Sequence, residues 1–328
     1  MAVLTASPPA TPPTTAPPGD VVHVFSASPA FGTDGLCLSA RESGLWCSWD
    51  DAVTWRPAAP EPGNGAATST AIAFSPRFAA DRTVFAGGHG AVFRSLDGGR
   101  RWRAMALPSP PPLVTCLVVP PAFEADGALL AGTLEDGVLR STDRGETWRR
   151  SNFGLLDPAV LALAVSPDVH PDDALVAGTE TGVSISRNGG RSWRETSFPE
   201  DAAPVLALAV SRTFAADGVL WAGTERAGVW RSADRGESWQ RVDRGAIVEP
   251  VDALLLPPPP DAAAVVLAIS PTSAAISRDR GRRWTAALAA PPDHGGIASV
   301  ALLSGAAIGA PLLVALRDGA VVRAVLEA

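Results

Sequence analysis

The sequence predicts an all-β chain folded as a seven-bladed β-propeller, with six complete blades and an incomplete seventh. An octapeptide recurs six times, and its closing tryptophans stand at 55, 102, 148, 193, 239 and 284, giving steps of 47, 46, 45, 46 and 45. Each period also holds four short apolar segments bounded by Gly, Pro and Asp, which is typical of strands. Four strands in about 46 residues is the pattern of a propeller blade.

The octapeptide is expected to form the hairpin loop between the third and fourth strands of a blade. Its Asp accepts amide hydrogens of its own turn, Ser supports that Asp, Gly supplies an unusual backbone angle, and Trp packs between blades. Ala52 stands in place of Gly and should strain its turn, whereas Asn188 stands in place of Asp and can keep the bond. The residues given this structural role are Ser48, Asp50, Trp55, Ser95, Asp97, Gly99, Trp102, Ser141, Asp143, Gly145, Trp148, Ser186, Asn188, Gly190, Trp193, Ser232, Asp234, Gly236, Trp239, Ser277, Asp279, Gly281 and Trp284.

The remaining segments of each period fit the same blade. In the fifth period, Val205–Val210, residues 219–223 and residues 228–232 are expected as strands one to three, with a short fourth strand opening at Trp239. A turn beginning with Phe and ending with Asp recurs between strands one and two, and its Phe is expected to be buried while its Asp bonds nearby amides. Copies occupy residues 78–81, 123–126 and 214–217, with variants at 31–34 and 169–172.

Two regions are expected along the chain. Residues 1–19 contain six prolines among Ala, Ser and Thr and are predicted to be a disordered tail, and residues 20–328 are predicted to be one propeller. After six periods of 46 residues, 33 of these 309 residues remain (309 − 276), and segments 297–303, 312–316 and 319–326 match strands one to three. Residues 2–5 are a candidate closing strand. Six blades with a C-terminal strap is the alternative.

The octapeptide identifies a resemblance to the Asp-box, or BNR-repeat, propeller superfamily over residues 20–328. That superfamily includes sialidases, xyloglucanases, sortilin-type receptors and photosystem II assembly factors. The sequence most resembles the assembly factors, because it lacks the sialidase catalytic motifs. The same scaffold serves enzymes and binders. The resemblance implies ligands on the face formed by the strand two-to-three loops and the interblade linkers.

Charged loop tips on that face are the candidate binding residues. They are Arg41, Glu42, His89, Glu135, Asp136, Glu180, Glu225 and Arg226. An acidic ring there suits a cationic segment, a cation or a sugar, and ordinary solvated loop tips are the alternative. The linker residues Phe153, Leu155 and Leu156 are expected to pack over the blade tops rather than to contact a ligand.

We expect a non-catalytic scaffold that docks another protein, because no loop offers convergent, dissimilar polar groups. A glycoside hydrolase that uses paired carboxylates is the first alternative function. A small ligand or a polysaccharide is the alternative to a protein partner. The sialidase branch needs a Tyr nucleophile and an Arg-Ile-Pro motif, and this sequence has neither. A sortilin-like peptide receptor is the second alternative, although its extra blades and cysteine-rich modules do not appear.

Composition narrows the remaining classes. With 46% hydrophobic residues the chain can bury a large core, which excludes disorder throughout. The 27 basic residues, all Arg, are scattered against 34 acidic ones, so nucleic acid is not expected as a partner. No metal or cofactor is expected, because four His and three Cys lack ligand spacing.

Location and assembly follow from the absence of targeting patterns. No signal-like start is seen, which predicts a cytoplasmic location. The chain is expected to be a monomer. The uncharged stretch 297–316 is interpreted as two strands rather than a membrane span. Cys37, Cys47 and Cys116 are expected as buried thiols, although Cys37 and Cys47 lie on neighbouring strands.

Overall fold

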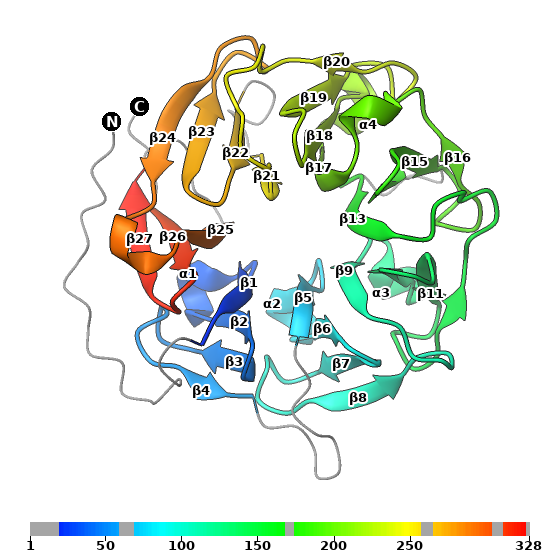
Figure 1. The fold of residues 1–328 in the computed structure, drawn as a ribbon. Coiled ribbons are helices and arrows are strands. Elements are labelled where there is room, and N and C mark those ends of the chain that lie inside the picture. The colour runs from blue at the N-terminus through cyan, green and yellow to red at the C-terminus, as the bar shows by residue number, and fades with distance from the viewer. Residues whose placement is uncertain (1–19, 59–68, 168–173, 257–264, 304–310, 326–328) are drawn as a thin grey trace.

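Seven antiparallel sheets surround a central channel in the computed structural model, which confirms the seven-bladed propeller (Figure 1). The structure describes residues 20–58, 69–167, 174–256, 265–303 and 311–325. Six sheets have four strands and the seventh has three, so the six-bladed alternative is wrong. The predicted tail at 1–19, the candidate closing strand at 2–5 and the variant turn at 169–172 lie outside the described residues.

Strands follow chain order from the channel to the outer edge of each blade. Blades 1 to 3 comprise β1 Val22–Ala27, β2 Cys37–Arg41, β3 Gly44–Ser48, β4 Arg56–Pro57; β5 Ser69–Phe74, β6 Val84–Gly88, β7 Ala91–Ser95, β8 Arg103–Ala106; β9 Val114–Val118, β10 Leu129–Thr133, β11 Val138–Ser141, β12 Arg149–Arg150. Blades 4 to 7 comprise β13 Val160–Val165, β14 Leu175–Thr179, β15 Val183–Ser186, β16 Arg194–Glu195; β17 Val205–Val210, β18 Leu220–Thr224, β19 Val229–Ser232, β20 Gln240–Arg241; β21 Ala253–Leu255, β22 Val266–Ile269, β23 Ser273–Ser277, β24 Thr285–Ala289; β25 Ile297–Leu302, β26 Pro311–Leu316, β27 Val321–Val325.

The expected Phe-to-Asp turns are single turns of α-helix. They are α1 Phe31–Asp34, α2 Phe78–Asp81, α3 Phe123–Asp126 and α4 Phe214–Asp217. The four phenylalanines are buried as expected. In α2 the Asp81 carboxylate accepts the amide hydrogen of Thr83 at 2.8 Å, so the Asp fixes the exit of the turn. Short 3-10 helices occur at Glu200–Ala202 and Pro292–His294.

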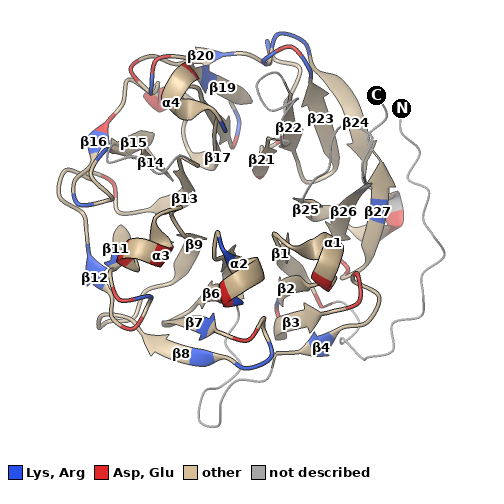
Figure 2. Ribbon diagram, turned by 180° about the vertical axis from the view of Figure 1, so that it is seen from behind, with Lys and Arg blue, Asp and Glu red and all other residues tan. Residues whose placement is uncertain are grey.

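The six octapeptides form the predicted loops. In blade 3, Ser141 Oγ donates to Asp143 Oδ1 at 2.8 Å and accepts the Gly145 amide hydrogen at 2.9 Å. Asp143 Oδ1 also accepts the Thr147 amide hydrogen at 2.9 Å, and Gly145 has a φ of +86°. These loops share one face with α1 to α4, called here the Asp-box face, which Figure 2 shows. The strand two-to-three loops and the interblade linkers form the opposite face, called here the linker face.

The two departing copies behave as predicted. Ala52 has a φ of +64°, a backbone region that Gly adopts without strain but other residues avoid. Asn188 Oδ1 accepts the Ser186 hydroxyl at 3.0 Å and the Ser192 amide hydrogen at 2.9 Å, so it keeps the turn bonds of an Asp.

Each box tryptophan packs against the preceding blade. Trp148 of blade 3 belongs to a buried cluster with Phe85 and Met105 of blade 2. Trp102 of blade 2 is clustered with Leu38 and Cys47 of blade 1. The predicted packing between blades is therefore confirmed, and the repeat explains why successive sheets hold together.

A second interblade contact joins Gly in strand two to Val of the next blade. A Cβ added at Gly87 or Gly132 would lie 2.5 Å from Val114 Cγ1 or 2.7 Å from Val160 Cγ1, so only Gly fits. The strand registers place Ala40 and Ser69 at the corresponding positions between blades 1 and 2. At this boundary Ala40 is larger than the Gly of those two seams, and Ser69 is smaller than the Val that faces that Gly.

Candidate functional site

The channel and the linker face differ in chemistry. A cavity of about 530 Å³ lies in the channel and is lined by the inner strands of blades 1, 2 and 4 to 7. Most of the side chains that line it are apolar, and Arg212 is the one charged side chain in it among the described residues. That guanidinium donates to the Leu256 carbonyl at 3.3 Å. The exposed carboxylates therefore belong to the loops of the linker face rather than to this cavity.

The linker-face loops are shaped by a repeated hydroxyl contact. Thr133 Oγ1 donates to the Gly137 carbonyl at 2.8 Å, and Thr224 Oγ1 donates to the Gly228 carbonyl at 2.9 Å. Gly137 has a φ of +74°, and a Cβ there would meet Asn152 at 2.5 Å. These contacts close the loops tightly and leave their acidic tips in solvent.

The structure separates the predicted site residues into three groups. Glu42, His89, Glu135 and Glu180 are exposed, and none has an ion pair with another described residue. Asp136 pairs with Arg150 at 2.9 Å, and Glu225 pairs with Arg226 at 3.3 Å. Arg41 is only 3% exposed and lies inside the contact between blades 7 and 1, away from solvent.

Two linker side chains project into solvent instead of packing. Phe153 and Leu156 are 82% and 71% exposed, so the expectation that they pack over the blade tops is wrong for both. Leu155 alone packs against the core. The linker is held by its backbone: the Phe153 carbonyl accepts the Trp193 amide hydrogen at 2.8 Å, and the next residue, Gly154, has a φ of +81°. This anchoring leaves the phenyl ring unburied.

The same linker lies between two loop tips of the acidic ring. The Pro158 carbonyl accepts the Gly137 amide hydrogen at 2.9 Å, which ties the linker to the loop of Glu135. Asp157 Oδ2 accepts the Thr181 amide hydrogen at 2.9 Å, which ties it to the loop of Glu180. We name the surface formed by Glu135, Phe153, Leu156 and Glu180 the blade 3–4 patch.

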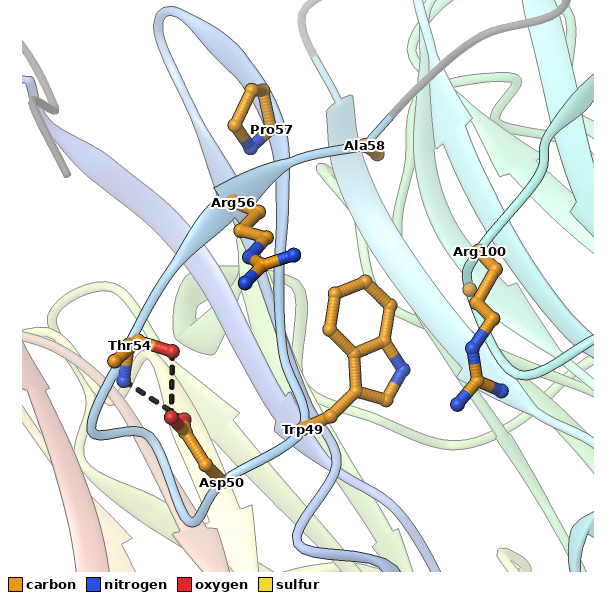
Figure 3. A pocket seen from close by; sticks show the side chains of 8 residues that line it. Trp49, Asp50, Thr54, Arg56, Pro57, Ala58 and Arg100 are labelled. Atoms are coloured by element: carbon orange, nitrogen blue, oxygen red, sulfur yellow. Dashed lines mark hydrogen bonds between the residues drawn. The ribbon is translucent and has the colours of Figure 1, made fainter. Parts of the chain in front are cut away.

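A groove that sequence reasoning missed lies between the outer edges of blades 1 and 2 (Figure 3). It has a volume of about 470 Å³ and is lined by Trp49, Asp50, Thr54, Arg56, Pro57, Ala58, Gly99 and Arg100. Trp49 is a second tryptophan within the first octapeptide, where the other copies have Leu, Thr, Arg or Ala. That extra Trp was the available signal, but the groove depends on Arg100 of the next blade.

Charges in this groove are set by local hydrogen bonds. Partial burial favours a raised pKa for Asp50, but bonds from the hydroxyl and amide of Thr54 and from Ser48 outweigh it and hold the pKa below its usual range. Arg100 Cζ lies 5.8 Å from the centroid of the Trp49 ring. Figure 3 shows the Arg56 and Arg100 side chains on either side of that indole.

Neither a metal cluster nor a membrane-spanning helix is found in the part of the chain that the structure describes. Among the described residues, no group of three or more His, Cys, Asp or Glu could hold a metal ion. No helix in the described part of the chain is both long and apolar enough to cross a membrane. The stretch 297–316 contributes β25 and β26, as predicted.

No protein-family model and no curated protein matches the sequence. YCF48 from Cyanidioschyzon merolae is 14% identical, with a TM-score of 0.66 over 95% of this chain and 97% of its own. A structure of YCF48 bound to D1 peptide is 16% identical, with a TM-score of 0.64 over 96% of each chain. A GH74 xyloglucanase from Xanthomonas campestris is 19% identical with a TM-score of 0.68 over 93% of this chain, which spans about half (52%) of that enzyme.

These likenesses define the class of fold. The chain is a seven-bladed propeller, structurally similar to YCF48 over 95–96% of its length and to one part of the GH74 enzymes. At identities below 20% the comparisons establish the architecture alone.

Proposed function

We propose that this chain is a non-catalytic propeller that docks a segment of another protein on its linker face. Support comes from the YCF48 structure bound to D1 peptide, because that propeller and this chain match over 96% of both lengths.

The blade 3–4 patch is the observation that carries the proposal. Phe153 and Leu156 are large apolar side chains left in water, and the linker that bears them is bonded to the loops of Glu135 and Glu180. Interface hot spots are typically aromatic anchors surrounded by a polar rim. This patch has an aromatic and an aliphatic anchor with a rim of two carboxylates that have no ion pair among the described residues.

The chemistry of the patch indicates the chemistry of its partner. Two exposed carboxylates favour Lys or Arg in the partner and speed its association at low salt. Phe153 and Leu156 favour apolar side chains beside those cations. The occupant is therefore a basic protein segment that also carries aromatic or aliphatic residues.

Affinity capture with the full chain tests this proposal. The wild type, a Phe153→Ser/Leu156→Ser variant and a Glu135→Lys/Glu180→Lys variant are compared by mass spectrometry, with Leu96→Ser as control. Leu96 is 60% exposed but lies in an octapeptide loop on the Asp-box face. We expect a partner that both patch variants lose and the control keeps. Equal capture by all four proteins contradicts the proposal.

Hydrolysis of a polysaccharide is the second candidate. It is favoured by one observation: an ancestral GH74 enzyme has a TM-score of 0.71 to this chain, higher than YCF48, although this chain spans only 45% of it. Release of reducing sugar from a polysaccharide panel, abolished by changing one linker-face carboxylate, would favour this candidate over docking.

A further inference from the structure

Two seams between blades on the Asp-box side, those of blades 2–3 and 4–5, contain an ion pair at equivalent repeat positions. Arg103, which follows the box tryptophan of blade 2, pairs with Glu146 in the box of blade 3 at 3.4 Å. Arg194 of blade 4 pairs in the same way with Glu237 in the box of blade 5 at 2.5 Å. In these two seams a carboxylate of the next box therefore neutralises the Arg of the outer strand.

Between blades 1 and 2, as between blades 3 and 4, an Arg stands where those two seams have a carboxylate. The residues at the corresponding repeat positions are Arg56 and Arg100. Neither forms an ion pair with any residue in the described part of the chain, and Arg100 Nη1 donates only to the Asp97 carbonyl, at 3.3 Å. The carboxylate of Asp50 also lines the groove, but its oxygens already accept hydrogen bonds from Thr54 and Ser48. The groove thus holds two guanidinium groups, those of Arg56 and Arg100, and one carboxylate that is already hydrogen-bonded within its own loop.

Trp49 adds an aromatic surface to this seam alone. Its Nε1 donates to the Gly98 carbonyl at 3.1 Å, which fixes the indole across the boundary between the blades. The ring is partly exposed and lies between the two guanidinium groups (Figure 3). Aromatic rings stack on indole with offset or edge-to-face geometry.

We propose that the groove between blades 1 and 2 binds a small aromatic anion, whose ring packs on Trp49 and whose carboxylate or phosphate meets Arg56 and Arg100. The oxyanion would supply the negative charge that Glu146 and Glu237 provide in the seams of blades 2–3 and 4–5. A volume of about 470 Å³ lies in the range of small-molecule sites. Guanidinium groups are well suited to carboxylate and phosphate. This site is separate from the blade 3–4 patch and does not depend on the docking proposal.

Titration calorimetry of the full chain with four probes tests the ligand class. The probes are benzoate, phenyl phosphate, benzyl alcohol as the neutral ring, and inorganic phosphate as the anion without a ring. We expect benzoate, phenyl phosphate or both to bind. The one with the lower Kd shows whether the site prefers a carboxylate or a phosphate. Benzyl alcohol and inorganic phosphate should each bind at least tenfold more weakly than that anion.

Variants locate the site. Arg100→Glu places a carboxylate where blades 3 and 5 have one, so it should preserve folding through a new pair with Arg56 and raise the Kd at least tenfold. Trp49→Leu should also raise the Kd at least tenfold. The matched control is Arg191→Glu, because the seam of blades 3 and 4 has Arg149 and Arg191 at the same repeat positions but Thr142 in place of Trp49. This control should leave the Kd within twofold.

Three results would overturn the proposal. They are no binding of either aromatic anion, equally tight binding of benzyl alcohol or inorganic phosphate, and an equal loss of affinity in Arg100→Glu and Arg191→Glu. Melting temperatures of all variants confirm that each is folded at the titration temperature.

Discussion

The guanidinium of Arg41 lies directly against the backbone of Gly319, joining the first blade to the last across 278 residues of chain. Arg41 Nη2 donates to the Gly319 carbonyl at 3.4 Å, and a Cβ at Gly319 would lie 2.8 Å from Arg41 Nη1. The same cation lies 5.7 Å from the ring centroid of Trp46 and 5.3 Å from that of Trp55. Burial lowers the pKa of Arg41, against the opposing charges of Asp20 and Asp318. Arg41 therefore acts in ring closure.

Replacing Arg41 should weaken that closure. Arg41→Ala removes two cation–aromatic contacts and leaves a cavity, so we expect a loss of about 2–4 kcal/mol in the free energy of unfolding. Denaturant unfolding measures this change. Arg226→Ala is the control, because Arg226 is exposed and pairs only with Glu225. Equal stability of the two variants would show that Arg41 has no part in closing the ring.

The box tryptophans should carry much of the interblade stability. Trp148 is buried with Phe85 and Met105, and its Nε1 donates to the Gly145 carbonyl at 3.1 Å. Trp148→Ala should cost about 3–5 kcal/mol, as for other buried aromatic side chains. An unchanged melting temperature would show that this Trp is not part of the core.

Ala52 offers a stabilising substitution. Its φ of +64° is costly for a residue with a Cβ, and Gly occupies the position in the other five boxes. Ala52→Gly should therefore raise the free energy of unfolding by about 1 kcal/mol. Gly145→Ala, at a φ of +86°, is the mirror experiment and should lower it. If both substitutions shift stability in the same direction, backbone strain is not the cause.

The box aspartates should give stability a dependence on acid pH. The hydrogen bond from the Thr147 hydroxyl holds the pKa of Asp143 below its usual 3.8. Partial burial opposes this shift, and bonds from the Thr147 amide and the Ser141 hydroxyl reinforce it. A lowered pKa in the folded state contributes stability that is present above pH 4 and lost as the pH falls through the folded pKa. Asp143→Asn removes this titration while retaining the turn, as Asn188 does. Its free energy of unfolding should fall less than that of the wild type between pH 5 and pH 2, and an equal fall would contradict this.

The three cysteines should be free and unreactive in the folded chain. Cys37 pairs with Ser48 and Cys47 with Leu38, so a one-residue offset places the two thiols on opposite faces of the sheet. Burial raises the pKa of Cys47 and of Cys116 to about 12, so little thiolate forms. Thiol titration at pH 8 should detect no thiol before unfolding and three after it. One thiol after unfolding without reductant would indicate a disulfide.

The repeat predicted the architecture because each blade is built from local signals. Ser141, Asp143, Gly145 and Trp148 act within one turn and one seam, so their spacing was sufficient. The role of Arg41 was not predictable, because Gly319 reaches it only after the ring closes. Phe153 was misjudged since its exposure depends on the backbone bond to Trp193, and the Trp49 groove depends on Arg100 of another blade.

Docking at the blade 3–4 patch is the central claim, and site-specific photocrosslinking tests it most directly. A photoreactive phenylalanine analogue is placed at position 153 or, as the comparison, at position 96 of the full chain, and both are irradiated in cells. We expect a defined protein adduct from position 153 and none from position 96, because Phe153 is 82% exposed within the patch. An adduct from position 96 alone, or none from either position, would contradict the claim.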